Sequence, residues 1–274
     1  MCGRYASFRE DQQLADEFAI ATVADDVRLL GPSWNVAPTD GVRVVVERPD
    51  ANGEIVRQLR VARWGLVPSW AKDRTIGSRF VNARAESLAQ SNAFARPFAV
   101  RRALLPADGY FEWQKLTEAA AGARARKQPF YLHPADGHPL ALAGLYEFWR
   151  DRTKAQDDPD RWLVTAVIIT RPASPELAPI HDRQPLMLTP DLWEAWLDPA
   201  VGPDGAARLL AADAPALVAV PVTDAVNSVR NNGPDLLAPA PTPEPAPGPE
   251  PGPARAPADT ATDTATDTDT DSPA

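Results

Sequence analysis

The single cysteine of this chain lies at position 2, directly after the initiator methionine. A small second residue generally permits removal of Met1, which would leave Cys2 with a free α-amine beside its thiol. Such a 1,2-aminothiol condenses with an aldehyde to an imine, and the thiol then closes on the imine carbon to give a five-membered thiazolidine. The amine titrates at a pKa of about 7.7–8 and the thiol at about 8.5, so neither needs strong activation. The alternative is an incidental or buried cysteine, although chain ends are usually exposed.

Two proline-containing loops carry polar and aromatic side chains that a plain core pattern does not require. The first, residues 34–38, holds Asn35, and the second, residues 63–70, holds Arg63 and Trp70. Asn, Arg and Trp together suit a groove that stacks bases and holds phosphates. Tryptophans in such loops also often cap a core, so this pattern alone leaves both interpretations open.

Three further segments place ionisable or amide groups in apolar surroundings. Asn82 and Arg84 stand two residues apart where a strand is expected to pass into a helix. Glu112 lies between Phe111 and Trp113, where burial would raise its pKa and suit it to acid/base chemistry. Strand alternation offers the alternative that Glu112 faces solvent. His181 follows a proline-rich loop and could move protons.

Alternating apolar and polar residues predict the strands that must position these groups. Residues 42–47 and 55–62 flank Pro49-Asp50-Ala51-Asn52-Gly53, and residues 130–133 and 140–145 flank Pro134-Ala135-Asp136-Gly137, so each pair reads as a β-hairpin. Further strands are expected at 103–105, 110–114, 162–170, 186–188 and 217–222. Helices are expected at 10–18, 86–92, 191–196 and, more weakly, 206–212. Strands and helices do not alternate regularly, which predicts an α+β fold, mostly antiparallel sheet with flanking helices.

Charge and composition divide the chain into two parts. Residues 1–237 are expected to form one domain, and residues 238–274 a disordered tail rich in Pro, Ala, Thr and Asp. The whole chain carries −9, but the tail holds seven acidic residues against Arg255, which leaves −3 for the domain. The acidic balance of the whole chain therefore argues only weakly against a nucleic-acid partner.

Several classes of protein are disfavoured. One cysteine excludes an intramolecular disulfide framework and fits a reducing compartment. The first residues lack the apolar stretch of a signal peptide, and no apolar run reaches the length of a membrane span. Three scattered histidines and one cysteine show no metal-site spacing. We expect a cytoplasmic monomer, associated with the nucleoid when bound to DNA, with no metal and no cofactor.

Seven blocks, in order along the chain, resemble the SRAP family (SOS response-associated peptidases, or abasic-site-processing proteins). They are Met-Cys-Gly-Arg-Tyr at 1–5, Trp-Asn-Val-Ala-Pro at 34–38, Trp-Gly-Leu-Val-Pro-Ser-Trp at 64–70, Val-Asn-Ala-Arg-Ala-Glu-Ser at 81–87, Pro-Ala-Asp-Gly-Tyr-Phe-Glu-Trp at 106–113, Ile-His-Asp-Arg-Gln-Pro at 180–185 and Val-Asn-Ser-Val-Arg-Asn-Asn-Gly-Pro-Asp-Leu at 226–236. The resemblance runs from Cys2 to about Pro239 and leaves only the tail uncovered.

The resemblance implies recognition of abasic sites in single-stranded DNA and a covalent thiazolidine cross-link through Cys2, which protects the lesion. It implies that Asn82 holds the N-terminus and the opened sugar, that Glu112 is the acid/base, and that His181 moves protons to and from the sugar hydroxyl. The same resemblance assigns the phosphates and the strand's path to Arg4, Arg84, Arg183, Asn35 and Trp70. A cysteine that often precedes Leu-Leu-Pro in the family is Ala103 here, and a second tryptophan after Trp70 is Ala71, which predicts weaker stacking on that side.

Other readings of the N-terminal cysteine remain. The family name implies peptidase activity, proposed for self-cleavage that exposes the cysteine, but only Met1 precedes Cys2 and an ordinary methionine aminopeptidase suffices. An N-terminal-nucleophile glutaminase also begins Cys-Gly and uses the thiol to attack an amide. That mechanism leaves Glu112 and His181 without a role. A non-catalytic single-strand binder, with Cys2 idle, is the third reading.

Overall fold

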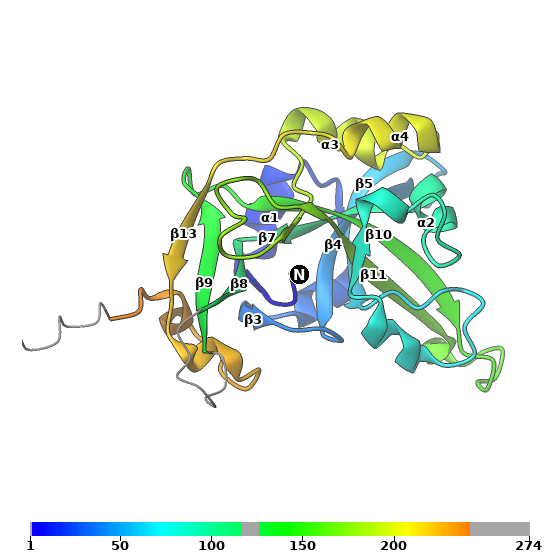
Figure 1. The fold of residues 1–274 in the computed structure, drawn as a ribbon. Coiled ribbons are helices and arrows are strands. Elements are labelled where there is room, and N and C mark those ends of the chain that lie inside the picture. The colour runs from blue at the N-terminus through cyan, green and yellow to red at the C-terminus, as the bar shows by residue number, and fades with distance from the viewer. Residues whose placement is uncertain (1, 117–125, 242–274) are drawn as a thin grey trace, which may run out of the picture. The chain divides into compact units, whose positions relative to one another are not determined.

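A computed structural model describes residues 2–116 and 126–241 of the chain (Figure 1). Residues up to Ala240 form one compact unit. Most of the expected tail and most of the excursion between residues 117 and 127 lie outside the described residues. Among the described residues, no helix combines the length and apolar character needed to cross a bilayer.

The strands, in chain order, are β1 (Tyr5–Ser7), β2 (Thr22–Val23), β3 (Ser33–Val36), β4 (Gly41–Pro49), β5 (Ile55–Trp64), β6 (Asn82–Arg84), β7 (Arg102–Ala107), β8 (Gly109–Lys115), β9 (Lys127–Pro134), β10 (Leu140–Arg150), β11 (Trp162–Pro172), β12 (Arg183–Pro185) and β13 (Leu217–Pro221). The α-helices are α1 (Asp11–Glu17), α2 (Ala95–Val100), α3 (Pro190–Leu197) and α4 (Pro203–Leu209). Short 3-10 helices join them, among them η3 (Ala85–Ser87) and η5 (Asp224–Asn227).

The larger sheet closes on itself. Its strands follow the order β12-β11-β10-β7-β4-β5-β2, with β6 beside β11. A parallel pairing of Thr165 with Arg63 joins β11 back to β5, so β11, β10, β7, β4 and β5 make a closed ring. Closure satisfies the edges of these strands and gives a rigid frame.

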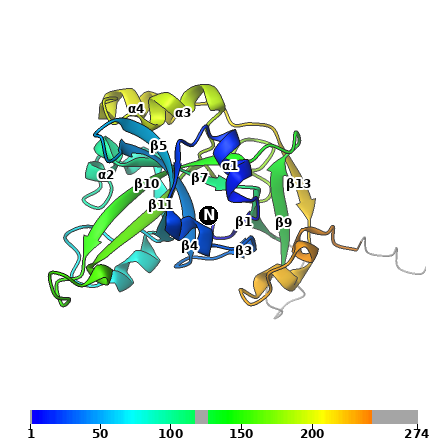
Figure 2. The ribbon, with the colours of Figure 1, turned by 180° about the vertical axis from the view of Figure 1, so that it is seen from behind.

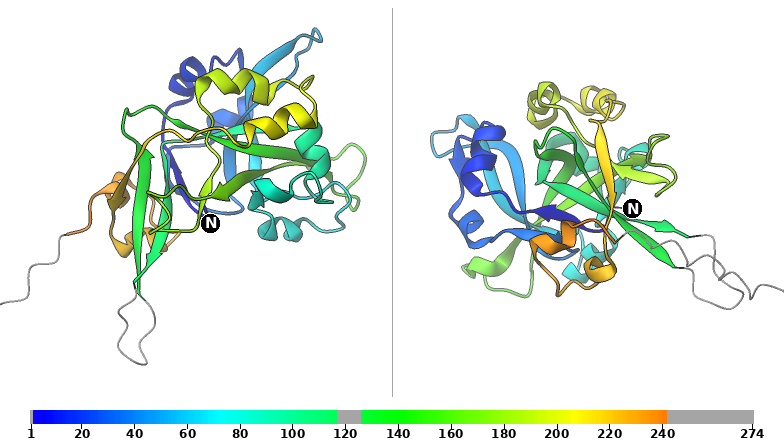
Figure 3. Two further views of the ribbon diagram at one scale, coloured as in Figure 1. Left: turned by 45° about the horizontal axis from the view of Figure 1, so that its top comes forward. Right: turned by 90° about the vertical axis from the view of Figure 1, so that its left-hand side faces the viewer.

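The smaller sheet carries the N-terminus. Its order is β13-β9-β8-β1-β3, and all its pairings are antiparallel. Figure 3 shows the β8–β9 hairpin extending away from the barrel. Side chains from both sheets form one apolar cluster, which includes Cys2, Tyr5, Trp64, Tyr110 and Ile168. The N-terminus is therefore part of the core.

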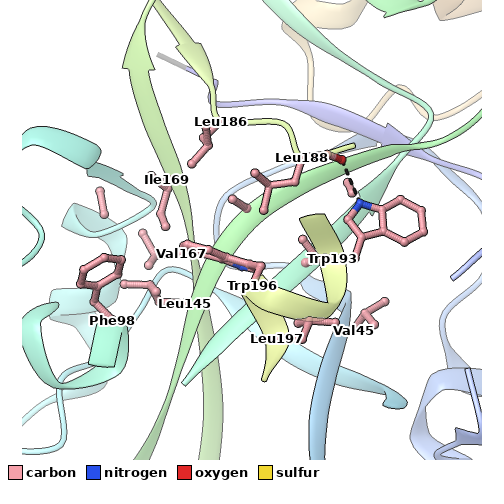
Figure 4. Close-up of a cluster of buried hydrophobic side chains, with 14 of the residues drawn as sticks. Val45, Phe98, Leu145, Val167, Ile169, Leu186, Leu188, Trp193, Trp196 and Leu197 are labelled. Carbon is pink, nitrogen blue, oxygen red and sulfur yellow. Dashed lines mark hydrogen bonds between the residues drawn. The ribbon is translucent and has the colours of Figure 1, made fainter. Parts of the chain in front are cut away.

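The helices cover a second apolar cluster on the other face of the barrel strands. Along β4, Val45 belongs to this cluster, whereas Val44 and Val46 belong to the first, as strand alternation requires. Trp193 and Trp196 of α3 fill it, and the indole nitrogen of Trp193 donates to the carbonyl oxygen of Leu188 at 2.8 Å (Figure 4). Figure 2 shows α1 on the side opposite to the view of Figure 1.

The predicted α+β fold with mostly antiparallel sheet is confirmed, and the first predicted hairpin forms as β4 and β5. The second predicted hairpin is wrong: β9 pairs with β8 and β13 of the smaller sheet, whereas β10 pairs with β7 and β11 of the larger one, so residues 135–139 lead the chain from one sheet to the other. Three elements differ from prediction. The expected helix at 86–92 is only the 3-10 helix η3, and a helix appears instead at α2, where Pro97 occupies the first turn and needs no amide partner. The expected strand at 186–188 lies three residues earlier, as β12, and the fourth helix begins at Pro203. The strand expected at Asn82 and Arg84 forms as β6, but the prediction did not include β1, β2 or β3, because strands of two to four residues carry too little alternation to detect.

Candidate functional site

Cys2 is held inside the protein by the strand that follows it. In β1, Tyr5 pairs with Tyr110 of β8, and the amide of Phe111 donates to the carbonyl oxygen of Arg4 at 2.9 Å. This pairing ties the chain end into the smaller sheet, so Cys2 is fully buried. The expectation of an exposed chain end was therefore wrong for this residue. Burial, together with the nearby negative charge of Glu112, raises the pKa of the Cys2 thiol well above its usual range.

Asn82 reaches Cys2 from a strand far along the chain. β6 lies parallel to β11, with Asn82 opposite Ile168, and the Asn82 amide nitrogen donates to the carbonyl oxygen of Cys2 at 2.8 Å. The other amide atom, Oδ1, is buried and has no hydrogen-bond partner among the described residues. One side of the Asn82 amide thus fixes the backbone of Cys2, and the other is an open acceptor in the same place.

Two glycines allow the loop before β6 to approach the barrel. Gly65 has φ +116°, and a Cβ there would lie 2.7 Å from the carbonyl oxygen of Gly77. A Cβ at Gly77 would lie 2.5 Å from the carbonyl oxygen of Gly65. Because only glycine permits this backbone crossing, the pair sets the path of the chain into Asn82.

Glu112 lies on β8, opposite Phe130 of β9, and its exposure is 3 %. The alternative in which Glu112 faces solvent is therefore excluded. Burial is the main cause that raises the pKa of Glu112 to about 7, and the negative charge of Asp182 adds to the shift. A carboxyl group with this pKa gives and takes a proton at neutral pH, as a general acid/base must.

His181 lies near the end of the loop between β11 and β12. The amide of Gln114, on the same strand as Glu112, donates to the carbonyl oxygen of Pro179 at 3.1 Å and so ties this loop to β8. Nδ1 of His181 accepts from the backbone amide of Arg183 at 3.0 Å and lies 2.9 Å from Oδ1 of Asp182. Burial lowers the pKa of His181, which favours the neutral ring. The contacts of Nδ1 with the Arg183 amide and the Asp182 carboxylate hold the orientation of the ring.

Arg4 and Asn35 contact each other and the segment 226–232. Nη1 of Arg4 donates to Oδ1 of Asn35 at 2.7 Å and to the carbonyl oxygen of Val226 at 2.9 Å. The amide nitrogen of the buried Asn35 donates to the carbonyl oxygens of Ser228 at 3.0 Å and Asn231 at 2.8 Å. Asn35 thus holds a loop in place, and direct DNA contact by its side chain stays a prediction. Nε of Arg4 is buried and has no partner among the described residues.

Trp70 and Arg84 present their side chains to solvent. The indole of Trp70 is 55 % exposed and its nitrogen donates to the carbonyl oxygen of Asn92 at 3.3 Å, which fixes the ring at the surface. Arg84 ends β6, two residues after Asn82, and is exposed. Both are therefore available to a strand of nucleic acid, as a stacking surface and a cation.

Arg183 is paired within the protein. Its guanidinium contacts both carboxylate oxygens of Glu86, at 2.5 and 3.0 Å, and the carbonyl oxygen of Thr170 at 2.7 Å. The sequence block that contains Glu86 did not predict this role, because nothing local to residues 81–87 indicates a partner 97 residues away.

The fold thus brings Cys2, Asn82 and Glu112 together, with His181 on a loop tied to the same strand as Glu112. Arg84 is on β6 and Arg183 is on β12, and both of these strands pair with the end of β11. Arg4 and Asn35 lie instead against the segment 226–232. Within the described residues, no cluster of three or more His, Cys, Asp or Glu could hold a metal ion.

A family model and several curated proteins match most of this chain. Residues 1–229 match the SOS response associated peptidase (SRAP) family. The chain is 34 % identical over 239 residues to the abasic site processing protein YoqW of Bacillus subtilis, covering 86 % of this chain and 99 % of that protein. It is 30 % identical over 249 residues to the abasic site processing protein YedK of Escherichia coli, covering 87 % and 100 %. It is 30 % identical over 234 residues to the chicken (Gallus gallus) protein HMCES, covering 76 % and 66 %.

Solved structures share the fold. A protein from Bacteroides thetaiotaomicron superposes with a TM-score of 0.72 at 22 % identity, covering 87 % of this chain and all of that one. A phage-related protein from Bordetella bronchiseptica gives a TM-score of 0.59 at 27 % identity, covering 81 % and 94 %.

Proposed function

The chain belongs to the SOS response associated peptidase (SRAP) family, and on that premise we propose that it captures abasic sites in single-stranded DNA as a thiazolidine on Cys2. Relatives named abasic site processing proteins support the substrate. The observation that best supports the proposed reaction is that Asn82 donates a hydrogen bond to the Cys2 carbonyl oxygen and that Glu112 is buried. The proposed nucleophile requires removal of Met1.

The proposed reaction consumes one aldehyde and releases one water. The ring-opened abasic sugar presents a C1 aldehyde, and the α-amine of Cys2 adds to it to give a carbinolamine. Loss of water, protonated by Glu112, leaves a protonated imine, to whose carbon the sulfur adds. The thiol proton passes to Glu112 and replaces the proton lost with the water, so the product is a neutral thiazolidine and Glu112 regains its starting state. Because Cys2 is buried, capture takes place away from bulk water, which limits hydrolysis of the imine.

The acid/base residues have distinct tasks in this scheme. The raised pKa of Cys2 keeps the sulfur protonated at neutral pH, so the amine reacts first and the thiol needs a base. Glu112, with a pKa of about 7, protonates the departing water and then accepts the thiol proton. His181, whose lowered pKa favours the neutral ring, assists opening of the sugar ring by proton transfer. Asn82 keeps the Cys2 backbone in place, and its free Oδ1 accepts from the sugar.

The DNA strand is held by contacts outside the reacting centre. Arg84 and Arg183 bind phosphates that flank the lesion, Arg4 adds positive charge beside the chain end, and Trp70 stacks a base. Asn35 shapes this path indirectly, through the loop 226–232 that it holds.

The first test incubates Met-processed protein with a single-stranded oligonucleotide that contains one abasic site, followed by a denaturing gel. We expect a shifted band with the unaltered protein and none with Cys2→Ala, while non-covalent binding survives. Cys2→Ser, which keeps the amine but not the sulfur, should give an adduct only when borohydride traps the imine. Absence of the band, with an intact N-terminal cysteine confirmed by mass, would overturn the proposal and make glutaminase activity the next assay.

A further inference from the structure

The guanidinium of Arg183 is anchored independently of any ligand. β12 pairs with the end of β11, where Arg183 lies opposite Pro172. Nη2 donates to the carbonyl oxygen of Thr170 at 2.7 Å and lies 3.3 Å from its hydroxyl. The side chain is 13 % exposed. The position of this cation is therefore set by the barrel.

The outer edge of the same guanidinium is occupied by a carboxylate. Nη1 and Nη2 of Arg183 contact Oε1 and Oε2 of Glu86 at 2.5 and 3.0 Å. Glu86 belongs to the 3-10 helix η3, and its side chain is 49 % exposed. The cation is thus fixed and mostly covered, whereas the anion is half in solvent and can turn outward.

A second arginine acts on the same carboxylate. The hydrogen bond from Arg183 is the largest cause that lowers the pKa of Glu86, and the charge of Arg84, two residues away, lowers it further. Glu86 therefore remains ionised at neutral pH and partly neutralises both arginines assigned to phosphate. A carboxylate bound through two parallel N–H···O bonds occupies the position that two phosphate oxygens take in the same geometry.

We propose that Glu86 occupies a phosphate subsite on Arg183 and leaves it when a DNA phosphate binds there. This inference rests on the proposed function only in taking the DNA strand as the ligand. Binding would exchange one anion for another on a guanidinium that stays anchored to Thr170, and Glu86 would turn into solvent. Half-exposed ion pairs contribute little to stability, so breaking the Glu86–Arg183 pair costs little free energy. A phosphate that neighbouring residues also hold can therefore replace Glu86. Glu86 would thus weaken binding of a strand that does not fill the rest of the site.

The test is a double-mutant cycle in a Cys2→Ala background, which removes covalent capture. Four proteins, with and without Glu86→Gln and Arg183→Gln, are titrated with an undamaged single-stranded oligonucleotide at several salt concentrations. We expect Glu86→Gln to tighten binding about three- to tenfold when Arg183 is present. In the Arg183→Gln background the same change should tighten it by less than about twofold, which measures the general effect of removing a negative charge. In Glu86→Gln alone, the slope of log affinity against log salt concentration should become more negative by up to about 0.7.

Three outcomes would overturn the inference: weaker or unchanged binding by Glu86→Gln, equal tightening in both backgrounds, or no binding of the undamaged strand by any of the four. Weaker binding would make Glu86 a positioning residue for Arg183. If Arg183→Gln fails to fold, Glu86→Asp replaces it in the comparison: its shorter side chain keeps the charge but loses the two-point contact, and intermediate tightening is expected. Cross-linking of an abasic strand by the protein with Cys2 intact is measured separately. Absence of cross-linking would contradict the proposed function but would leave the result of the double-mutant cycle unchanged.

Discussion

The side-chain amide of Asn82 donates a hydrogen bond of 2.8 Å to the backbone carbonyl of Cys2, across 80 residues of sequence. The contact depends on β6 lying beside β11 and on β1 lying beside β8. It gives the chain end one position relative to Glu112. Such preorganisation lets an amine and a carboxyl group act on the same carbon atom without a search through conformations.

Asn82→Ala should slow cross-linking by about 10- to 100-fold, because the Cys2 backbone loses its donor and the sugar loses an acceptor. The loss of one hydrogen bond should lower the free energy of unfolding by only about 1 kcal/mol. Single-turnover gel assays measure the rate, and denaturant unfolding measures the stability. Asn52→Ala, in the exposed turn between β4 and β5, serves as the control and should leave the rate unchanged.

Glu112→Gln should reduce the rate of adduct formation by about 100-fold or more, because the amide can neither donate the proton to departing water nor accept the thiol proton. Affinity for an undamaged strand should stay within about twofold of the unaltered protein. Samples quenched at successive times and run on denaturing gels give the rate, and fluorescence anisotropy gives the affinity. A loss of affinity with an unchanged rate would contradict the acid/base role.

The raised pKa of Glu112 also predicts how stability depends on pH. The folded protein holds this proton up to a pH of about 7, whereas an unfolded chain releases it near about 4.3. The folded state therefore binds more protons between these values, and the contribution of Glu112 to stability falls as pH rises from about 4 to about 7. Relative to Glu112→Gln, the unaltered protein should lose about 3 kcal/mol over this range. Urea unfolding at several pH values checks this, and parallel curves for the two proteins would contradict it.

Trp70→Ala should weaken non-covalent binding of single-stranded DNA by about 5- to 100-fold, the range for loss of one stacked base. Trp70→Phe should recover most of the affinity, because a π-face remains. Trp162→Ala is a matched control, since Trp162 is also an exposed tryptophan, at the start of β11. Equal losses from Trp70→Ala and Trp162→Ala would argue against a specific stacking site.

Asn35→Ala separates loop support from DNA contact. The side chain accepts from Arg4 and donates to backbone carbonyls of the segment 226–232, so its removal should cost about 2–3 kcal/mol of unfolding free energy. Proteolysis should then cut the segment 226–232 faster, which limited digestion followed by mass spectrometry can detect. A fully stable Asn35→Ala protein with reduced DNA affinity would instead favour direct contact.

The β4–β5 hairpin was predictable because apolar runs indicate strands, and the turn residues between the two runs fix where the chain reverses. β4 and β5 pair from Gly41 opposite Arg63 to Pro49 opposite Ile55, on either side of the turn at residues 50–54. The same signals at residues 130–145 predicted a hairpin that does not form, because β9 and β10 pair with strands of different sheets. The same local information indicated Glu112, a carboxylate flanked by aromatic residues within an apolar strand. It could not decide whether Glu112 faces the core, because one strand has two faces and the sheet that covers each comes from elsewhere in the chain.

The sequence by itself determined the reactive groups: one cysteine that can become the N-terminal residue, and the amide, carboxyl, imidazole and guanidinium groups in their characteristic blocks. Only the tertiary structure decided which of them meet. Burial of Cys2, its contact with Asn82, the support of the segment 226–232 by Asn35, and the pairing of Glu86 with Arg183 all join residues many tens of positions apart. Such pairs depend on strand order and on closure of the barrel, which arise from packing of the whole chain and leave no periodic signal near either residue.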